Sequence, residues 1–157
     1  MEEQIIEALK SCFDAEEVEA TGNTEYGLPV YDVDGDEYLV GTYNEVYNAA
    51  VEEAKQCFED CYSDEDKVQW LKNQGWPGVD KESVAEDCGD EEWEPDFDEV
   101  EEVMGFSWDF LKSYVDEDEL GEYVVDCDGI ANGLAKYDGE EHTIDVDGET
   151  YYCYRTN

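Results

Sequence analysis

Hydrophobic residues recur at every third or fourth position over several stretches of the chain, as they do on the buried face of an amphipathic helix. In residues 2–13 this face holds Ile5, Ile6 and Leu9. The clearest helix follows Thr42, because Thr42 and Glu45 have the spacing of a capping box and an apolar face then continues to about Tyr62. The same spacing predicts further helices after Ser63, after Pro95, over residues 107–115 and from Asp116 to about Cys127.

Apolar and aromatic residues flank two Asp-Gly pairs, Asp34-Gly35 and Asp147-Gly148. A two-residue hairpin turn needs positive φ at both positions, which Asp and Gly adopt readily, so the pattern predicts hairpins over residues 29–41 and 143–154. We expect Thr21-Gly22-Asn23 and Gly27 to lie in a loop before the first hairpin. Together the elements predict an α+β fold, in which an antiparallel sheet from two β-hairpins is packed on one face with four to five α-helices.

The helical pattern is weakest over residues 79–95, which are rich in acid. We interpret them as a seam or a long acidic loop within a single compact domain, residues 1–157, with two small lobes as the alternative at this length. Pro95 is expected in the first turn of the next helix, where proline is tolerated. Phe97, Val100, Val103 and Met104 then fall on one side of that helix, and its acids fall largely on the other.

The charge of the chain changes this picture of an ordinary domain. The chain has 47 Asp and Glu residues against 8 Lys and Arg, a formal charge of −39 that destabilises a compact state by self-repulsion. Aromatic residues nevertheless make up 13% of the chain and hydrophobic residues 41%, so we expect a folded core under an acidic surface rather than a disordered chain. A field of this sign disfavours direct binding of nucleic acid.

Neither a membrane span nor a signal peptide is expected. No run of about 18 apolar residues occurs, and the acidic start Met1-Glu2-Glu3 differs from the basic region that opens a signal peptide. We therefore expect a cytoplasmic protein, in the cytoplasm of the host cell if a phage encodes it.

Six cysteines are expected to be buried free thiols, since the chain is long enough to form a core and lacks an export signal. Cys57 and Cys61 would lie on the same side of a helix. A metal pair there stays an alternative, but His142 is the only histidine and no Cys-x-x-Cys occurs, so we predict no metal site and no cofactor.

Three Asp-x-Asp-Gly segments end at Gly35, Gly129 and Gly148. Calcium binding is one interpretation of these segments, but an EF-hand loop requires Asp at position 1, which would fall on Val30, Val124 and Thr143. Tight turns are therefore the preferred interpretation. The chain has no phosphate-cradling glycine loop, no nucleophile elbow and no local Cys-His pairing, and we predict no enzyme activity. A carboxylate-based enzyme stays a third hypothesis.

Acids are densest from Glu86 to Glu102, where eleven of seventeen residues are acidic and none is basic. Acids four residues apart on a helix are separated by about 6 Å of rise, which is comparable to the spacing of phosphates along a DNA strand. Such a surface can occupy the nucleic-acid-binding cleft of a basic host protein. The residues predicted to contact this partner are Glu86, Asp87, Asp90, Glu91, Glu92, Glu94, Asp96, Asp98, Glu99, Glu101, Glu102, Asp116, Glu117, Asp118, Glu119, Glu52, Glu53, Glu59 and Asp60.

The last 30 or so residues, with Tyr137-Asp138-Gly139-Glu140-Glu141 and Tyr151-Tyr152-Cys153-Tyr154-Arg155, resemble the tails of small acidic phage-encoded proteins. In size and charge the whole chain is similar to phage DNA-mimic inhibitors of the anti-restriction and anti-CRISPR type. The resemblance implies a host CRISPR effector or restriction enzyme as the target. The alternative function is that of an acidic cation-binding or structural interaction protein. Adaptation to high salt is an alternative explanation of the negative charge. The oligomeric state stays open, and a homodimer is one of the options.

Overall fold

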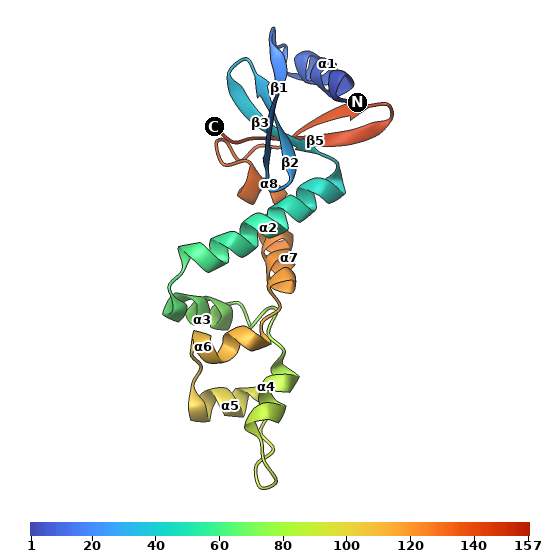
Figure 1. Cartoon of the computed structure of the whole chain (residues 1–157). Helices are drawn as coiled ribbons and strands as arrows, with labels where there is room; N and C mark the ends of the chain where they lie inside the picture. The colour runs from blue at the N-terminus through green and yellow to red at the C-terminus, as the bar shows by residue number, and fades with distance from the viewer. The chain divides into compact units, whose positions relative to one another are not determined.

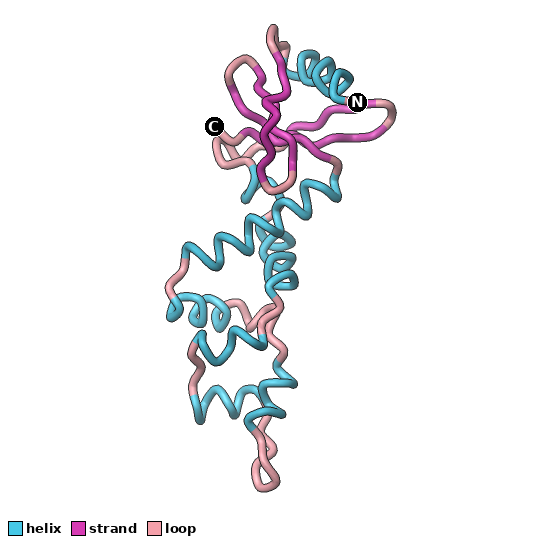
Figure 2. Tube along the Cα trace, in the orientation of Figure 1, coloured by secondary structure: helices cyan, strands magenta, loops and turns pink.

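The chain forms an α+β fold with an open five-stranded antiparallel sheet and eight α-helices, as predicted in class, in a computed structural model that describes residues 1–157 (Figure 1). It divides into two compact units. The sheet unit comprises Met1–Ala54 and Val124–Asn157, and the helical unit comprises Lys55–Tyr123. All five strands belong to the sheet unit (Figure 2). No helix is both long and apolar enough to cross a membrane.

The divisions between the units fall within two helices, α2 (Tyr43–Cys61) and α7 (Glu117–Asp128). We expected one compact domain with a seam at residues 79–95. Those residues instead lie inside the helical unit, where α4 (Lys81–Cys88) occupies half of them. The side chain of Asp80 accepts a hydrogen bond from the Ser83 N–H at 3.1 Å, which caps a helix that the acid-rich sequence conceals.

Both predicted hairpins are confirmed in the sheet unit. Its strands are β1 (Val18–Glu25), β2 (Leu28–Val33), β3 (Asp36–Gly41), β4 (His142–Val146) and β5 (Glu149–Arg155), in the order β1-β2-β3-β5-β4. Asp34 and Gly35 have φ of 51° and 93°, and the corresponding turn in the second hairpin also has positive φ at both positions. The hairpins join through β3 and β5, where Leu39 pairs with Tyr154.

The loop predicted at Thr21-Gly22-Asn23 is wrong, because these residues lie in β1. A segment without apolar side chains is tolerated there because β1 is an edge strand and because its register with β2 shifts between Ala20 and Thr24. Gly22 has a φ of 80°, which suits such an irregularity. Gly27 does lie in the following turn, as predicted, with a φ of 81°.

Helices cover both faces of the sheet rather than one. On one face α1 (Glu2–Phe13) packs with Ile5 and Leu9 against a cluster that includes Tyr31 and Val40. On the other face α2 and α8 (Ile130–Leu134), a short helix that the pattern did not predict, pack against Leu28, Val30, Leu39 and Tyr154. Successive strand residues point to opposite faces, so the apolar run from Tyr38 to Val40 serves both cores.

The helical unit contains α3 (Asp64–Asn73), α4, α5 (Phe97–Met104), α6 (Trp108–Leu111) and the short 3₁₀ helix η1 (Lys112–Tyr114). Four of its aromatic side chains, Phe58, Trp76, Phe97 and Trp108, are buried together. The rings of Phe58 and Trp108 contact edge to face with their centroids 5.5 Å apart, and those of Trp76 and Phe97 do so with their centroids 5.3 Å apart. Burying an aromatic side chain stabilises a fold by about 1.5–3 kcal/mol, and this core offsets the repulsion between surface carboxylates.

Two predictions for α5 need correction. Pro95 precedes the helix rather than entering its first turn, and Asp96 caps it by accepting a hydrogen bond from the Glu99 N–H at 2.9 Å. Only Phe97 and Val100 are buried. Val103 and Met104 are 70% and 58% exposed, because the helix ends after two turns and the core contacts end with Val100.

Candidate functional site

The helical unit holds 24 acidic residues and only five lysines. Lys55, Lys67, Lys72 and Lys112 pair with acids of the unit itself, at nitrogen–oxygen distances between 2.6 and 3.8 Å. Since five lysines neutralise at most five of the 24 carboxylates, the surface of this unit is strongly negative. Negative charge is therefore the dominant chemical property of this surface.

The predicted contact residues from Glu86 to Glu102 all lie in this unit and are exposed, with one exception. Glu101 is half-buried, and its carboxylate forms an ion pair with the Lys72 ammonium, with 3.2 Å between Oε1 and Nζ. Between α4 and α5 the chain turns tightly, because the Asp90 carboxylate accepts hydrogen bonds from the N–H groups of Glu92 at 2.8 Å and Trp93 at 2.7 Å. The part of the predicted seam or acidic loop that follows α4 is thus a loop with its own hydrogen bonds.

Two of the predicted contact residues have a structural role as helix caps. Asp96 caps α5, and Asp116 caps α7 by accepting hydrogen bonds from the N–H groups of Asp118 and Glu119 at 3.0 and 3.2 Å. Asp118 also pairs with Lys55 at 2.6 Å. These carboxylates hold the unit together, while Glu117 and Glu119 are exposed beside them.

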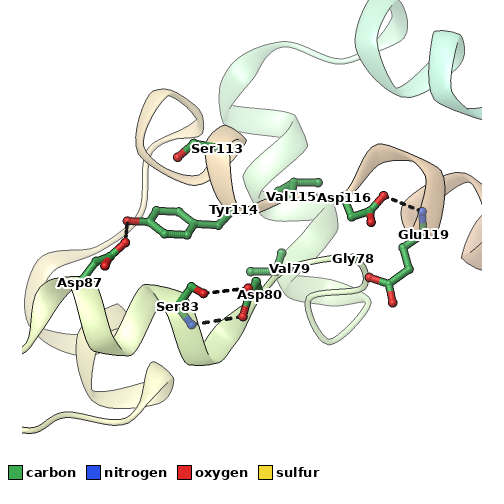
Figure 3. Close-up of a pocket in the computed structure, with 10 residues that line it drawn as sticks. All are labelled: Gly78, Val79, Asp80, Ser83, Asp87, Ser113, Tyr114, Val115, Asp116 and Glu119. Carbon is green, nitrogen blue, oxygen red and sulfur yellow. Dashed lines mark hydrogen bonds between the residues drawn. The ribbon is translucent and has the colours of Figure 1, made fainter.

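A hollow of about 730 Å³ brings the two predicted acidic segments together (Figure 3). Four carboxylates line it, those of Asp80, Asp87, Asp116 and Glu119, together with the hydroxyls of Ser83, Ser113 and Tyr114. Asp80 was not among the predicted contact residues. Its spacing to Ser83 is typical of a helix cap and could have marked the start of α4.

Backbone pairing between residues 78–80 and 114–116 builds this hollow. The Asp80 N–H donates to the Tyr114 carbonyl at 2.9 Å, and the Asp116 N–H donates to the Gly78 carbonyl at 2.8 Å. Gly78 has a φ of 74°, and a Cβ at this position would lie 2.9 Å from the carbonyl oxygen of Asp116. Glycine is therefore required where the two strands of chain approach each other.

Hydrogen bonds shift the pKa values of one carboxylate and one tyrosine in the hollow. Hydrogen bonds from the side chain and backbone of Ser83 hold the pKa of Asp80 below its ordinary value. The Tyr114 hydroxyl donates to Asp87 at 2.8 Å, and this bond raises the pKa of the tyrosine. A carboxyl that serves as a general acid needs a raised pKa, so the shift of Asp80 suits a permanently charged binding surface.

The predicted contact residues on α2 are divided between the units. Glu59 and Asp60 are exposed in the helical unit, and Glu52 is exposed in the sheet unit. Glu53 was predicted to be a surface acid, but its side chain is only 17% exposed and lies 3.9 Å from the Lys136 ammonium. Burial raises the pKa of Glu53, and the positive charge of the Lys136 ammonium opposes this shift.

One group of side chains in the sheet unit has the chemistry of a cation site. The ligand atoms of Asp138, Glu140 and His142 all lie within 4.8 Å of one another. The His142 ring is oriented by Phe13, whose ring centroid is 5.0 Å away. The predicted contact residues did not include this group, because Asp138 and Glu140 lie in the turn and loop before β4, where no strand periodicity relates them to His142.

The prediction that the cysteines are buried is wrong for five of the six, because only Cys153 is buried. Cys57 and Cys61 do lie side by side, with 3.3 Å between their sulfurs. The first and third Asp-x-Asp-Gly segments form hairpin turns, as predicted. The second ends α7, and Gly129 follows it with a φ of 88°.

Comparisons of this chain with protein-family models, with curated proteins and with solved structures gave no match.

Proposed function

We propose that the protein is a DNA-mimic inhibitor whose acidic helical unit occupies the nucleic-acid-binding cleft of a host defence protein, a CRISPR effector or a restriction enzyme. The observation that carries this proposal is the excess of 24 acids over five lysines on a unit that keeps an aromatic core. Most of these carboxylates are exposed, and many are placed on helices or in capped turns. Their positions are therefore fixed before a partner arrives, which lowers the entropy lost on binding.

The partner's chemistry follows from the charges it normally binds. A cleft that holds duplex DNA presents Lys and Arg at the spacing of phosphates, and Arg forms bidentate bonds with carboxylates as it does with phosphates. Carboxylates on α5 and on the loop before it offer several such acceptors within one unit. Inhibition then arises because the same basic side chains cannot hold nucleic acid at the same time.

The test uses acids that have no capping role. We expect the triple variant Asp98→Asn, Glu99→Gln and Glu102→Gln to weaken inhibition of DNA cleavage, measured with a panel of purified restriction enzymes and CRISPR effectors. A matched control neutralises three exposed acids of the sheet unit, Glu16, Glu17 and Glu19. Binding of the wild type should weaken steeply with salt, and the affinity of the triple variant should depend less steeply on salt than that of the wild type.

Two outcomes contradict the proposal. One is an affinity for the inhibited enzyme that is the same at low and high salt. The other is an equal loss of inhibition in the control variant, because the net charge alone would then act and no surface of the helical unit would be specific.

A second candidate function is cation binding, and the group of Asp138, Glu140 and His142 favours it. One imidazole and two carboxylates suit zinc better than calcium, which prefers six or more oxygen ligands. Calorimetry with each cation tests it: stoichiometric binding that is lost on His142→Gln supports this function, and weak binding that is unaffected by the substitution excludes it.

A further inference from the structure

The C-terminal end of α5 exposes an apolar pair in the middle of the acidic surface. Val103 is the most exposed of the large hydrophobic side chains, at 70%, and the next residue in the chain, Met104, is 58% exposed. Val100, one turn earlier, is fully buried, so the same side of the helix passes from core to solvent within one turn. Exposure of adjacent Val and Met side chains to water is unfavourable, and their burial against a partner would contribute favourable free energy to binding.

The acids around this pair determine what can cover it. Glu99 lies one turn before Val103 on the same side of α5, and Glu102 is exposed next to it. The last turn of α5 has no basic residue, and the unpaired carbonyls at a helix C-terminus add partial negative charge. An acidic or purely apolar partner would meet unfavourable charge or leave carboxylates desolvated, so a partner that covers Val103 and Met104 must bring cations with it.

A second apolar surface with an acidic rim follows immediately along the chain. Phe106 and Trp108 line a hollow of about 510 Å³ together with residues of α3, and the hollow has both apolar and acidic walls. Its apolar walls are Val68, Phe106 and Trp108, and its acidic walls include Asp64, Glu65 and Asp109. It repeats the chemistry of the α5 end, with an apolar centre and carboxylates around it.

We propose that this surface, Val103-Met104 and the neighbouring hollow, docks a basic amphipathic segment of the target protein. Apolar side chains of the segment cover Val103 and Met104, and its Lys and Arg side chains pair with the surrounding acids. Met side chains adapt to differently shaped apolar partners, which suits a surface of this kind. The inference rests on the proposed function, and it adds a contribution to affinity that salt does not screen.

Two peptide probes separate the apolar contribution from the charge. The first is a Leu/Lys peptide of about 15 residues, long enough to fold as an amphipathic helix on binding. The second has the same number of lysines with serine in place of leucine. Affinity for the full-length protein is measured by fluorescence anisotropy from about 0.05 to about 0.5 M NaCl, a range over which screening changes strongly.

The test variant is Val103→Ser with Met104→Ser, which leaves the net charge unchanged. Its control is Tyr43→Ser in the sheet unit, where the replaced side chain is 54% exposed. We expect the double variant to bind the Leu/Lys peptide about tenfold more weakly at high salt, with an unchanged salt slope and unchanged affinity for the Lys/Ser peptide. The control should bind both peptides as the wild type does.

Unchanged affinity of the double variant for the Leu/Lys peptide overturns the inference, as does an equal loss in the Tyr43→Ser control. Failure of the proposed function has a different signature, because the wild type would then inhibit no member of the nuclease panel even though its binding of the Leu/Lys peptide still depended on Val103 and Met104.

Discussion

Lys67 is the only charged side chain of the chain that is buried, at 4% exposure, and it tests how the helical unit stays folded. Its ammonium lies 5.2 Å from the centre of the Trp108 ring. It also lies 3.7 Å from a Glu59 carboxylate oxygen and 3.8 Å from one of Asp64. Both carboxylates are more than half exposed, so solvent screens the two ion pairs.

Two substitutions separate the packing of Lys67 from its charge. Lys67→Ala removes three buried methylene groups, worth about 0.8 kcal/mol each, and a cation–π contact worth about 0.5–2 kcal/mol. With two screened ion pairs of about 0–1 kcal/mol together, the expected loss is about 3–5 kcal/mol of unfolding free energy. Lys67→Met keeps most of the packing, so we expect a loss of about 1–2 kcal/mol, mainly from the missing charge.

Tryptophan fluorescence during urea unfolding measures this loss in the relevant unit. The four tryptophans of the chain, at positions 70, 76, 93 and 108, all belong to the helical unit, so their emission reports that unit alone. High salt should lower the deficits of both variants by the same amount, because both lack the same charge, and the larger remainder for Lys67→Ala should come from lost packing. Equal losses for the two variants would refute the reasoning, since charge rather than packing would then account for the effect of Lys67.

Three further predictions concern backbone contacts and thiols. Gly78→Ala should destabilise the helical unit more than Gly75→Ala, as measured by urea unfolding, because both glycines have positive φ but only Gly78 would bring a Cβ against the Asp116 carbonyl. At mild alkaline pH a thiol reagent should modify exposed Cys61 and spare Cys153 until the protein unfolds, because Cys153 is buried and burial raises its pKa to about 12. The same pKa shift should make the sheet unit lose stability as pH rises from 9 to about 12, because the thiol ionises in the unfolded chain at a lower pH than in the folded one. Unfolding measured by circular dichroism tests this loss, and Cys153→Ala should reduce the dependence of stability on pH.

Local signals with their own geometry could be read from the sequence. The Asp34-Gly35 turn needs positive φ, which few other pairs adopt, and the Thr42–Glu45 box satisfies helix N–H groups with side chains only three residues away. Both were predicted correctly because no distant residue is involved. The same reasoning located the exposed acids, since 47 carboxylates have almost no cations with which to be buried.

Elements that depend on distant contacts could not be read in this way. The polar residues of β1 form a strand only because β2 supplies hydrogen bonds beside them. Val103 matches the helical period of a buried residue, but nothing in the sequence shows that the core ends at Val100. The hollow beside Asp80 likewise depends on pairing with residues 114–116, more than thirty positions away.

The acids of the helical unit therefore serve two purposes, and experiments must separate them. Asp80, Asp96 and Asp116 accept hydrogen bonds from N–H groups at the starts of helices, where negative charge also interacts favourably with the helix dipole. These carboxylates stabilise the unit that the remaining acids destabilise by repulsion. Their substitution would lower inhibition by unfolding the unit and would say nothing about contact with a partner. Substitutions at Asp98, Glu99 and Glu102 instead remove repulsive charge, while Asp98 and Glu99 also lose a favourable interaction with the dipole of α5, so we expect a stability within about 1 kcal/mol of the wild type. A loss of inhibition at unchanged stability, together with full inhibition by the control variant of the sheet unit, indicates lost contact, and this combination is the result that the DNA-mimic proposal requires.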